Sequence, residues 1–456
     1  MKENGNGFSS IVERETGLRR ALSGAQMSMI AIGTAIGTGL FLGSGFAIGF
    51  AGPSVLISYA IGAFISLLLI GCLAEMVVAH PTSGSFGSYA EHYVGPWAGF
   101  AVRYAYWSAI VLAVGTEVTA VALYMHYWFP ASPSWIWIVL FSGALIFVNA
   151  TSVGMFGSVE YTFSAVKVSA IIAFVLLGSW MLYAAPDNAP IGFKNYHDFL
   201  PHGWSGTWIA VIVAIFSYLG IETVAVAAGE ASDPQRAVTT AFRSTILRLV
   251  LFYLLTIGLM LAIVPWSAAG SGASPFVTTM EALHIPGAAG IMNFVILVAA
   301  LSSMNSQLYT ATRTMFSLGR AGQAPARFGV LNARGVPTAA LAISCFGIAL
   351  ATVTSVLMPE GGFVMMMAIS MFGALFTWMM IFVTHFFFRR HWAASGAAPL
   401  AFRMRGYPWL TILGALLMLV VMVTTAFTNE FRLTLLTGVP FLAALALLYF
   451  LRFRRR

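Results

Sequence analysis

Long apolar runs dominate the chain and recur from Met27 almost to the C-terminus, with short polar stretches between them. A helix needs about 20 mostly apolar residues to cross roughly 30 Å of hydrocarbon, so each run is a candidate membrane span. The runs are too long, and apolar on too many sides, for the alternating strands of a transmembrane β-barrel. The pattern predicts an all-α integral membrane protein with twelve transmembrane helices. The predicted spans are Met27–Phe50, Val55–Val78, Gly99–Phe129, Ser134–Ala150, Val159–Ala184, Trp208–Ala228, Ser244–Val264, Ala288–Ala311, Thr338–Val356, Phe363–Phe388, Trp409–Phe427 and Leu433–Phe450.

Composition agrees with this pattern, since 59% of the residues are apolar and 8% are charged. The first twenty residues hold no apolar core followed by a small-residue cleavage site, so we expect no removable signal peptide. The two cysteines, Cys72 and Cys345, fall inside predicted spans and lack metal-ligand spacing. We expect no disulfide framework, no metal site and no cofactor.

Basic residues produce a net charge of +8, and they gather in every second loop. If the N-terminus is cytoplasmic, nearly all arginines fall on the cytoplasmic face, and the opposite loops keep only Lys194 and Arg432. This positive-inside bias predicts a multi-pass protein of the cytoplasmic (inner) membrane with both termini in the cytoplasm. It explains the charge without nucleic-acid binding. The arginines predicted to be cytoplasmic are Arg14, Arg19, Arg20, Arg236, Arg243, Arg313, Arg320, Arg327, Arg334, Arg389, Arg390, Arg403, Arg405, Arg452, Arg454, Arg455 and Arg456.

The first span contains the segment IAIGTAIGTGLFLGSG, which has five glycines in sixteen residues. Close packing against a neighbouring helix is one explanation of these glycines, because Gly33 and Gly37 are four residues apart, as are Gly39 and Gly43. A phosphate-binding loop is a poor rival, since no strand precedes the glycines and no acidic residue follows about twenty residues later.

The sixth span is also interrupted, in FSYLGIETVAVAAGEASDP from Phe216 to Pro234. Paired interruptions in corresponding positions of two halves indicate the binding site of a secondary transporter. Backbone that leaves the helical pattern frees N–H and C=O groups that lipid cannot satisfy. The N-terminal ends of the resumed half-helices suit a carboxylate, and freed carbonyls suit an ammonium, so a ligand with both groups fits.

The pairing predicts a core of five plus five inverted-repeat helices with discontinuous helices 1 and 6, flanked by two peripheral helices. We expect a cytoplasmic N-terminal segment, two repeats, and a last unit with the peripheral spans and a basic cytoplasmic C-terminus. These units are 1–26, 27–184 (spans 1–5), 185–390 (spans 6–10) and 391–456.

Several motifs together resemble bacterial amino acid permeases, specifically the amino acid transporter branch of the amino acid–polyamine–organocation superfamily. The resemblance runs in order from about Gly17 to about Trp409 and does not identify the substrate. The motifs are IGTAIGTGLFLGSG, LAEM…PTSGSF, TEVTAVALYMHYW, FSYLGIE and LSSMNSQLYTATRTMFSLGRAGQAP.

The resemblance implies that the unwound part of span one binds the α-carboxylate and α-amino groups, and that span six surrounds the amino group and side chain. Tyr218 departs from the phenylalanine expected there and adds a hydroxyl. Asn305 and Ser306 match the family's polar pair, with interhelical hydrogen bonding as the alternative role. The implied binding residues are Ala35, Ile36, Gly37, Thr38, Gly39, Phe216, Ser217, Tyr218 and Gly220.

Lys167, Glu117 and Glu222 lie inside predicted spans, where a charge costs at least about 2.5–3.5 kcal/mol. The resemblance implies that the ammonium of Lys167 replaces a sodium ion between spans one and eight, so we expect proton-coupled symport, with Glu222 passing or sensing the proton. A structural lysine paired to Glu117 or to backbone is the alternative. Glu75 and Glu160, near cytoplasmic ends, are expected to be structural.

Other functional classes are weighed by their motifs. We find no HExxH motif, no paired acids at metal-ligand spacing and no GxSxG motif with partners, so no motif indicates an enzyme. Nothing in the sequence predicts the filter of a channel. The sequence predicts an amino acid importer that works by alternating access. An amino acid sensor with the same site stays open, as does sodium-coupled or exchange transport of amino acids or amines. The expected partners are an amino acid, a proton and the lipid bilayer, and the expected state is a monomer or weak homo-oligomer.

Overall fold

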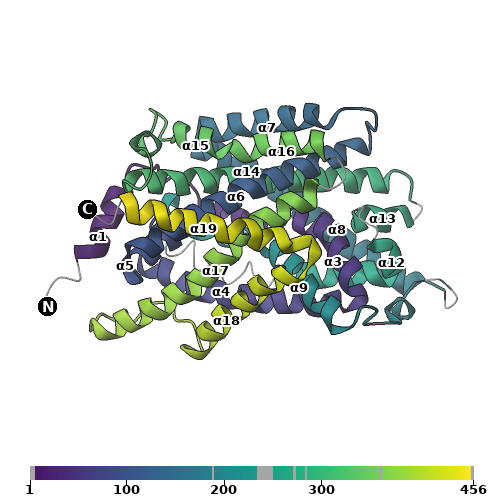
Figure 1. The fold of residues 1–456 in the computed structure, drawn as a ribbon. Coiled ribbons are helices and arrows are strands. Elements are labelled where there is room, and N and C mark those ends of the chain that lie inside the picture. Colours follow the sequence, from purple (N-terminus) through teal and green to yellow (C-terminus); the bar gives the residue numbers. More distant parts are fainter. Residues whose placement is uncertain are drawn as a thin grey trace.

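The computed structural model describes residues 6–186, 189, 191–233, 250–270, 274–282, 285–358 and 362–452. Over these residues the chain is a bundle of helices without a β-strand, and the all-α prediction is confirmed there (Figure 1). A single parallel bridge joins Leu22 to Ala231. Backbone hydrogen bonding is therefore satisfied almost entirely within helices, as hydrocarbon demands.

Ten helical runs among the described residues are long and apolar enough to cross a membrane. They are Gly39–Ala79, with η1 (Gly39–Gly43), α3 (Ser44–Ala51), η2 (Gly52–Ser54) and α4 (Val55–Ala79); α6 (Pro96–His126); α7 (Ser134–Thr151); α8 (Val153–Ala184); Gly203–Glu230, with α9 (Gly203–Tyr218), α10 (Thr223–Ala227) and η4 (Ala228–Glu230); α14 (Ala288–Arg320); Thr338–Leu357, with α15 (Thr338–Ser344) and α16 (Phe346–Leu357); α17 (Gly362–Ala394); Trp409–Phe427, with α18 (Trp409–Thr424) and η6 (Thr425–Phe427); and Asn429–Arg452, with η7 (Asn429–Phe431) and α19 (Arg432–Arg452).

The first of these runs is too long for one crossing. Its 41 residues would extend about 60 Å as a straight helix, twice the hydrocarbon thickness. The chain turns at Gly52, where φ is 61° and Pro53 follows, and both α3 and α4 pack against α9. A shorter apolar helix covers Val250–Ile263 and matches the end of the predicted seventh span, whose beginning at Ser244 lies outside the described residues.

The remaining helices are short and lie at the two ends of the bundle or break its spans. They are α1 (Asn6–Arg14), α2 (Gly24–Gly33), α5 (Ser85–Tyr93), η3 (Phe193–Tyr196), α12 (Trp266–Ala269), α13 (Pro275–Ala282) and η5 (Ala326–Gly329).

The core of the bundle is built around α6 and α14, which pack against each other. α17 packs on α6, and α2 packs on α8. The most apolar stretch of Gly203–Glu230 is 89% buried, whereas the corresponding stretches of Trp409–Phe427 and Asn429–Arg452 are 28% and 17% buried. These last two runs therefore lie at the periphery, as do α7 and α8, whose most apolar stretches are 22% buried.

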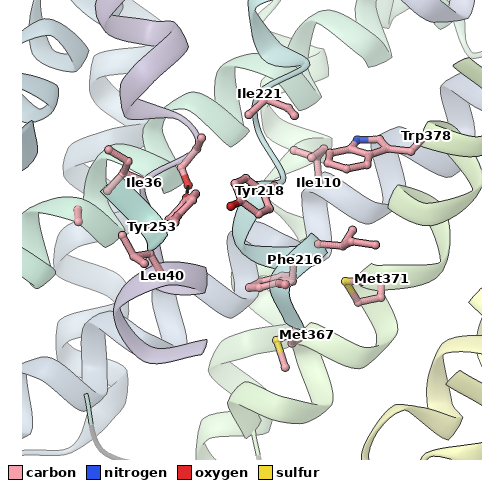
Figure 2. Packing of buried hydrophobic residues seen from close by; sticks show 14 of the residues in the cluster. Ile36, Leu40, Ile110, Phe216, Tyr218, Ile221, Tyr253, Met367, Met371 and Trp378 are labelled. Carbon is pink, nitrogen blue, oxygen red and sulfur yellow. Dashed lines mark hydrogen bonds between the residues drawn. The ribbon is translucent and has the colours of Figure 1, made fainter. Parts of the chain in front are cut away.

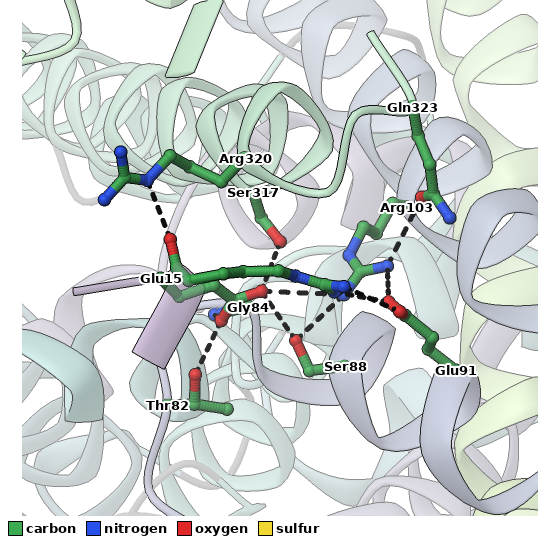
Figure 3. A network of polar contacts seen from close by, with 10 residues as sticks. Glu15, Thr82, Gly84, Ser88, Glu91, Arg103, Ser317, Arg320 and Gln323 are labelled. Carbon is green, nitrogen blue, oxygen red and sulfur yellow. Dashed lines mark hydrogen bonds and ion pairs between the residues drawn. The ribbon is translucent and has the colours of Figure 1, made fainter. Parts of the chain in front are cut away.

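The N-terminal segment crosses the end of the bundle where α19 also finishes (Figure 1). The carboxylate of Glu15 accepts hydrogen bonds from Thr82, Ser88 and Ser317, and Arg103 links it to Glu91 (Figure 3). Arg14 also pairs with Glu91, and Arg320 donates to the carbonyl of Arg14, so three described arginines join this hydrogen-bonded network. Five of the arginines predicted to be cytoplasmic lie outside the described residues: Arg236, Arg243, Arg454, Arg455 and Arg456.

Candidate functional site

The first predicted span is interrupted between α2, which ends at Gly33, and η1, which begins at Gly39. Three carbonyls of the interruption accept hydrogen bonds from side chains of other helices. Tyr253 donates to Ala35 at 2.6 Å, and Lys167 donates to Gly33 and Ile36. The backbone that lipid cannot satisfy is thus satisfied from neighbouring spans.

Glycine is required here by close approach. A Cβ atom on Gly37 would lie 2.7 Å from the hydroxyl oxygen of Ser303, and one on Gly39 would lie 2.6 Å from Cα of Ser217. Two of the glycines therefore pack closely against α14 and α9, and they also leave the backbone bare at the cavity described below.

The sixth predicted span is interrupted between α9, which ends at Tyr218, and α10, which begins at Thr223. Gly220 sits in this break with φ of 104°, a conformation that glycine adopts without strain. Thr34 donates from its hydroxyl to the carbonyl of Gly220 at 2.9 Å, and Ser217 donates to that of Gly39 at 2.6 Å. The two interruptions therefore face and bind each other.

A small cavity of about 20 Å³ lies between the interruptions. That volume holds about one water molecule, so the cavity must widen before an amino acid can enter. Among the predicted residues, eight line it: Ala35, Gly37, Gly39, Glu117, Phe216, Ser217, Gly220 and Ser306.

Polar atoms without partners surround this cavity. The hydroxyl of Ser306 and the side-chain carbonyl of Gln307 belong to lining residues, are buried and have no hydrogen-bond partner in the structure. Buried polar groups are usually paired, because leaving one unpaired costs about 1–3 kcal/mol. These two atoms are free to bind a polar ligand.

Three predicted binding residues lie outside the cavity lining. Ile36 is buried, and its carbonyl accepts a bond from Lys167. The backbone N–H of Thr38 donates to Glu117 at 3.4 Å. Tyr218, which is labelled in Figure 2, donates from its hydroxyl to the carbonyl of Tyr59 at 3.3 Å. The added hydroxyl of Tyr218 is thus engaged within the protein.

Asn305 also lies away from the cavity. Its amide nitrogen donates to Glu160 at 3.2 Å, and its carbonyl accepts from Asn149 at 2.8 Å. This is the interhelical bonding that the sequence offered as its alternative role, while its neighbour Ser306 faces the cavity.

The cavity has further lining residues that the sequence did not single out. The sequence could have marked Gln307 and Ser303, because they belong to the polar stretch LSSMNSQ inside an apolar span. It does not mark the small residues of α6 and α17, since alanine is common in any span. The additional lining residues are Thr34, Ala109, Ile110, Ala113, Leu219, Thr223, Ser303, Gln307, Ser370 and Ala374.

Lys167 lies on α8, fully buried, with its ammonium behind the interruption of the first span. Nζ donates to the carbonyls of Gly33 and Ile36, the latter at 3.0 Å, and to the hydroxyl of Ser302 at 2.8 Å. Three acceptors satisfy its three N–H donors. Within the described part of the chain, no carboxylate forms a direct ion pair with Lys167.

Glu117 and Glu222 occupy separate surroundings. Glu117 accepts from Ser303 at 2.8 Å and from Gln307 at 3.3 Å, beside the cavity. Glu222 accepts from Tyr106 at 2.9 Å, from Trp378 at 3.3 Å and from the backbone N–H of Gly220. Glu222 thus holds the break in the sixth span, and no hydrogen bond joins it to Lys167.

Comparison with known proteins places almost the whole chain in a family. The family described as "Amino acid permease" matches residues 26–454. The chain belongs to this family. The permease is 37% identical to the gamma-aminobutyric acid permease of Bacillus subtilis (strain 168) over 97% of its own length and 95% of the relative's. It is 36% identical to the aromatic amino acid transport protein AroP of Escherichia coli O157:H7, over 90% of both chains.

A third relative, the amino-acid permease RocE of Bacillus subtilis (strain 168), is 35% identical over 96% of both chains. The superfamily resemblance inferred from motifs is therefore confirmed, and the permease is a multi-pass membrane transporter rather than an enzyme.

Proposed function

We propose that the permease is a secondary active transporter that imports an amino acid across the cytoplasmic membrane together with a proton. Its relatives include permeases named for gamma-aminobutyric acid and for aromatic amino acids, which supports a substrate of this chemical class. Two facing helix interruptions with a cavity between them are typical of the binding sites of secondary transporters.

The substrate binds between the interruptions. Its carboxylate lies against the start of η1, near Gly37 and Gly39, where helix-end N–H groups attract negative charge. Its amino group lies against backbone carbonyls of the interruptions and the hydroxyl oxygen of Ser217. The unpartnered hydroxyl of Ser306 and the side chain of Gln307 complete the contacts.

The observation that carries proton coupling is the position of Lys167. Its ammonium binds the carbonyls of Gly33 and Ile36 and the hydroxyl of Ser302, which are oxygen ligands of the kind that a metal cation would take. Lys167 loses its charge when it releases a proton, and its hydrogen bonds hold the end of α2 against α8. Release of the proton therefore links the proton gradient to helix movement.

The topology of this proposal has twelve spans, with five plus five in inverted repeats and two peripheral. Both termini and the segment Arg313–Pro337 face the cytoplasm. The common position of α1 and the end of α19 supports an even number of crossings (Figure 1).

The test is uptake of a radiolabelled mixture of the common amino acids and 4-aminobutyrate into proteoliposomes. We expect accumulation to follow an inward pH gradient without sodium, and Lys167→Ala to abolish that accumulation. A requirement for sodium would refute proton coupling. Binding without any accumulation would instead identify a sensor.

A further inference from the structure

The proposed function leaves the buried carboxylate of Glu160 unused. It lies on α8, fully buried, seven residues before Lys167, which corresponds to about 10 Å along the helix. The sequence suggested a structural role for it. Its carboxylate nevertheless belongs to the same hydrogen-bonded chain as the lysine.

Ser302 on α14 connects the two charged groups. Its hydroxyl accepts a hydrogen bond from Nζ of Lys167 at 2.8 Å and donates one to Oε1 of Glu160 at 2.5 Å. The two hydrogen bonds thus run in one direction, from ammonium to carboxylate, through a single hydroxyl. This is the arrangement in which a proton passes along a chain without any heavy atom moving far.

We propose that Glu160 is the proton acceptor of Lys167 during transport, and that Ser302 relays the proton between them. This inference rests on the proposed proton coupling. In the step, an N–H bond of Lys167 breaks as an O–H bond forms on Ser302. The original O–H bond of Ser302 breaks as one forms on Oε1 of Glu160. The products are an amine and a carboxylic acid, so the net charge of the buried pair does not change.

Burial favours such an exchange, because both charged groups are removed from water and neutral forms avoid the cost of desolvation. The carboxylate is positioned for the role by Asn305, which donates to Oε2 at 3.2 Å, and by Asn149, which in turn donates to Asn305. Ser164 also donates to Oε1, at 3.3 Å, whereas the hydrogen bonds of Lys167 go to Gly33, Ile36 and Ser302.

Two other charged groups on neighbouring helices already have partners. On α6, Glu117 interacts electrostatically with the ammonium, but its oxygens accept hydrogen bonds from Thr38, Ser303 and Gln307. On α14, Arg313 is already paired with Glu230 of η4 at 2.7 Å. α2 contributes carbonyls, and α7 contributes Asn149. Among the described residues, Glu160 is therefore the acid that a hydrogen-bonded path joins to Lys167.

Proton transfer also has a mechanical consequence. The amine keeps two N–H donors for the carbonyls of Gly33 and Ile36, but these hydrogen bonds lose the strength that the positive charge gave them. The hold of Lys167 on Gly33 and Ile36 therefore weakens, which loosens α2 from α8. Because Glu160 lies toward the end of α8 proposed to be cytoplasmic, the proton moves in the direction of import as that side opens.

The experiment compares two activities of the same proteoliposomes. Counterflow at equal pH requires binding and alternating access, whereas accumulation driven by a pH gradient also requires proton transfer. The probe is the radiolabelled mixture of common amino acids and 4-aminobutyrate. A gradient of about one pH unit drives about tenfold accumulation at one proton per substrate.

We expect Ser302→Ala and Glu160→Gln to retain counterflow but to lose the tenfold accumulation and the substrate-induced acidification of the lumen. Ser302→Thr, which keeps a hydroxyl, should restore both. Ser164→Ala is the matched control, because it removes a different hydroxyl from Glu160 and leaves the relay in place.

Undiminished accumulation by Ser302→Ala or Glu160→Gln would overturn the relay. Loss of counterflow together with accumulation in both variants, with Ser164→Ala intact, would also overturn it and assign the residues a structural role. If wild-type protein fails to accumulate substrate with the pH gradient, the proposed proton coupling itself is wrong, so the two failures are distinguished.

Discussion

The hydroxyl of Ser217 donates a hydrogen bond of 2.6 Å to the carbonyl oxygen of Gly39 and so joins the two interrupted helices at the cavity. The same hydroxyl bonds with that of Tyr59 at 2.9 Å. One small side chain of α9 therefore fixes the distance between the interruptions. Anything that enlarges residue 39 must disturb this contact.

Replacing Gly39 by leucine is expected to abolish substrate binding. A Cβ atom there would lie 2.6 Å from Cα of Ser217, and the rest of the side chain would occupy the cavity. Loss of the thermal stabilisation given by amino acids would be the measurement. Gly143→Leu is the control, because Gly143 is exposed on α7 and its Cβ would meet nothing within 4 Å. Unchanged affinity of Gly39→Leu would limit the glycine to helix packing.

The cavity should reject acidic amino acids. Glu117 is the ionisable side chain among the described residues that line it, and no lysine, arginine or histidine does so. A second carboxylate would be buried near Glu117 without a partner, which is costly. In a thermal-shift screen, a neutral amino acid at 100 times its dissociation constant should add about 2.7 kcal/mol of stability. Aspartate and glutamate should add none, and a shift with either would contradict this view of the cavity.

Stability should decline between about pH 6.5 and pH 4 because of His80, which follows α4 at the end of the bundle. Burial, helped by the nearby His92, lowers the pKa of His80 to about 4 from 6.5. Within this window the unfolded chain binds a proton that the folded chain does not, so stability falls as pH falls. The full effect is about 3 kcal/mol.

Thermal unfolding at pH 7 and pH 5 measures this dependence. His80→Gln should reduce the pH dependence, although it also removes a 2.7 Å hydrogen bond to Tyr93. His202→Gln, at an exposed histidine beyond the membrane spans, serves as the control and should leave the difference between the two pH values unchanged. Equal pH dependence in wild type and His80→Gln would exclude this histidine as the cause.

Labelling with a membrane-impermeant thiol reagent tests the topology. In a background without Cys72 and Cys345, we expect Ala326→Cys to react only after cells are lysed, because it lies in the segment proposed to be cytoplasmic. Phe193→Cys should react in intact cells, since Phe193 is 91% exposed on the predicted opposite face. Labelling of Ala326→Cys from outside would reverse the orientation.

Much of the fold is predictable from the sequence, because the hydrocarbon of the membrane requires each crossing to be a long apolar helix. The interruptions at Gly33–Gly39 and Tyr218–Thr223 were also predictable, since glycine and acidic residues break an otherwise apolar pattern. The position of Lys167 followed from resemblance to known permeases, and its charge inside a span marked it as unusual.

Only the tertiary structure decided where the individual side chains point. Tyr218 and Ser217 are neighbours in sequence, yet Ser217 faces the cavity and Tyr218 bonds to Tyr59. Asn305 and Ser306 divide in the same way. The link from Lys167 through Ser302 to Glu160 joins positions up to 142 residues apart. Such contacts depend on the rotation and packing of helices that are distant in sequence, and hydrophobic periodicity does not determine those in spans that are apolar on nearly every side.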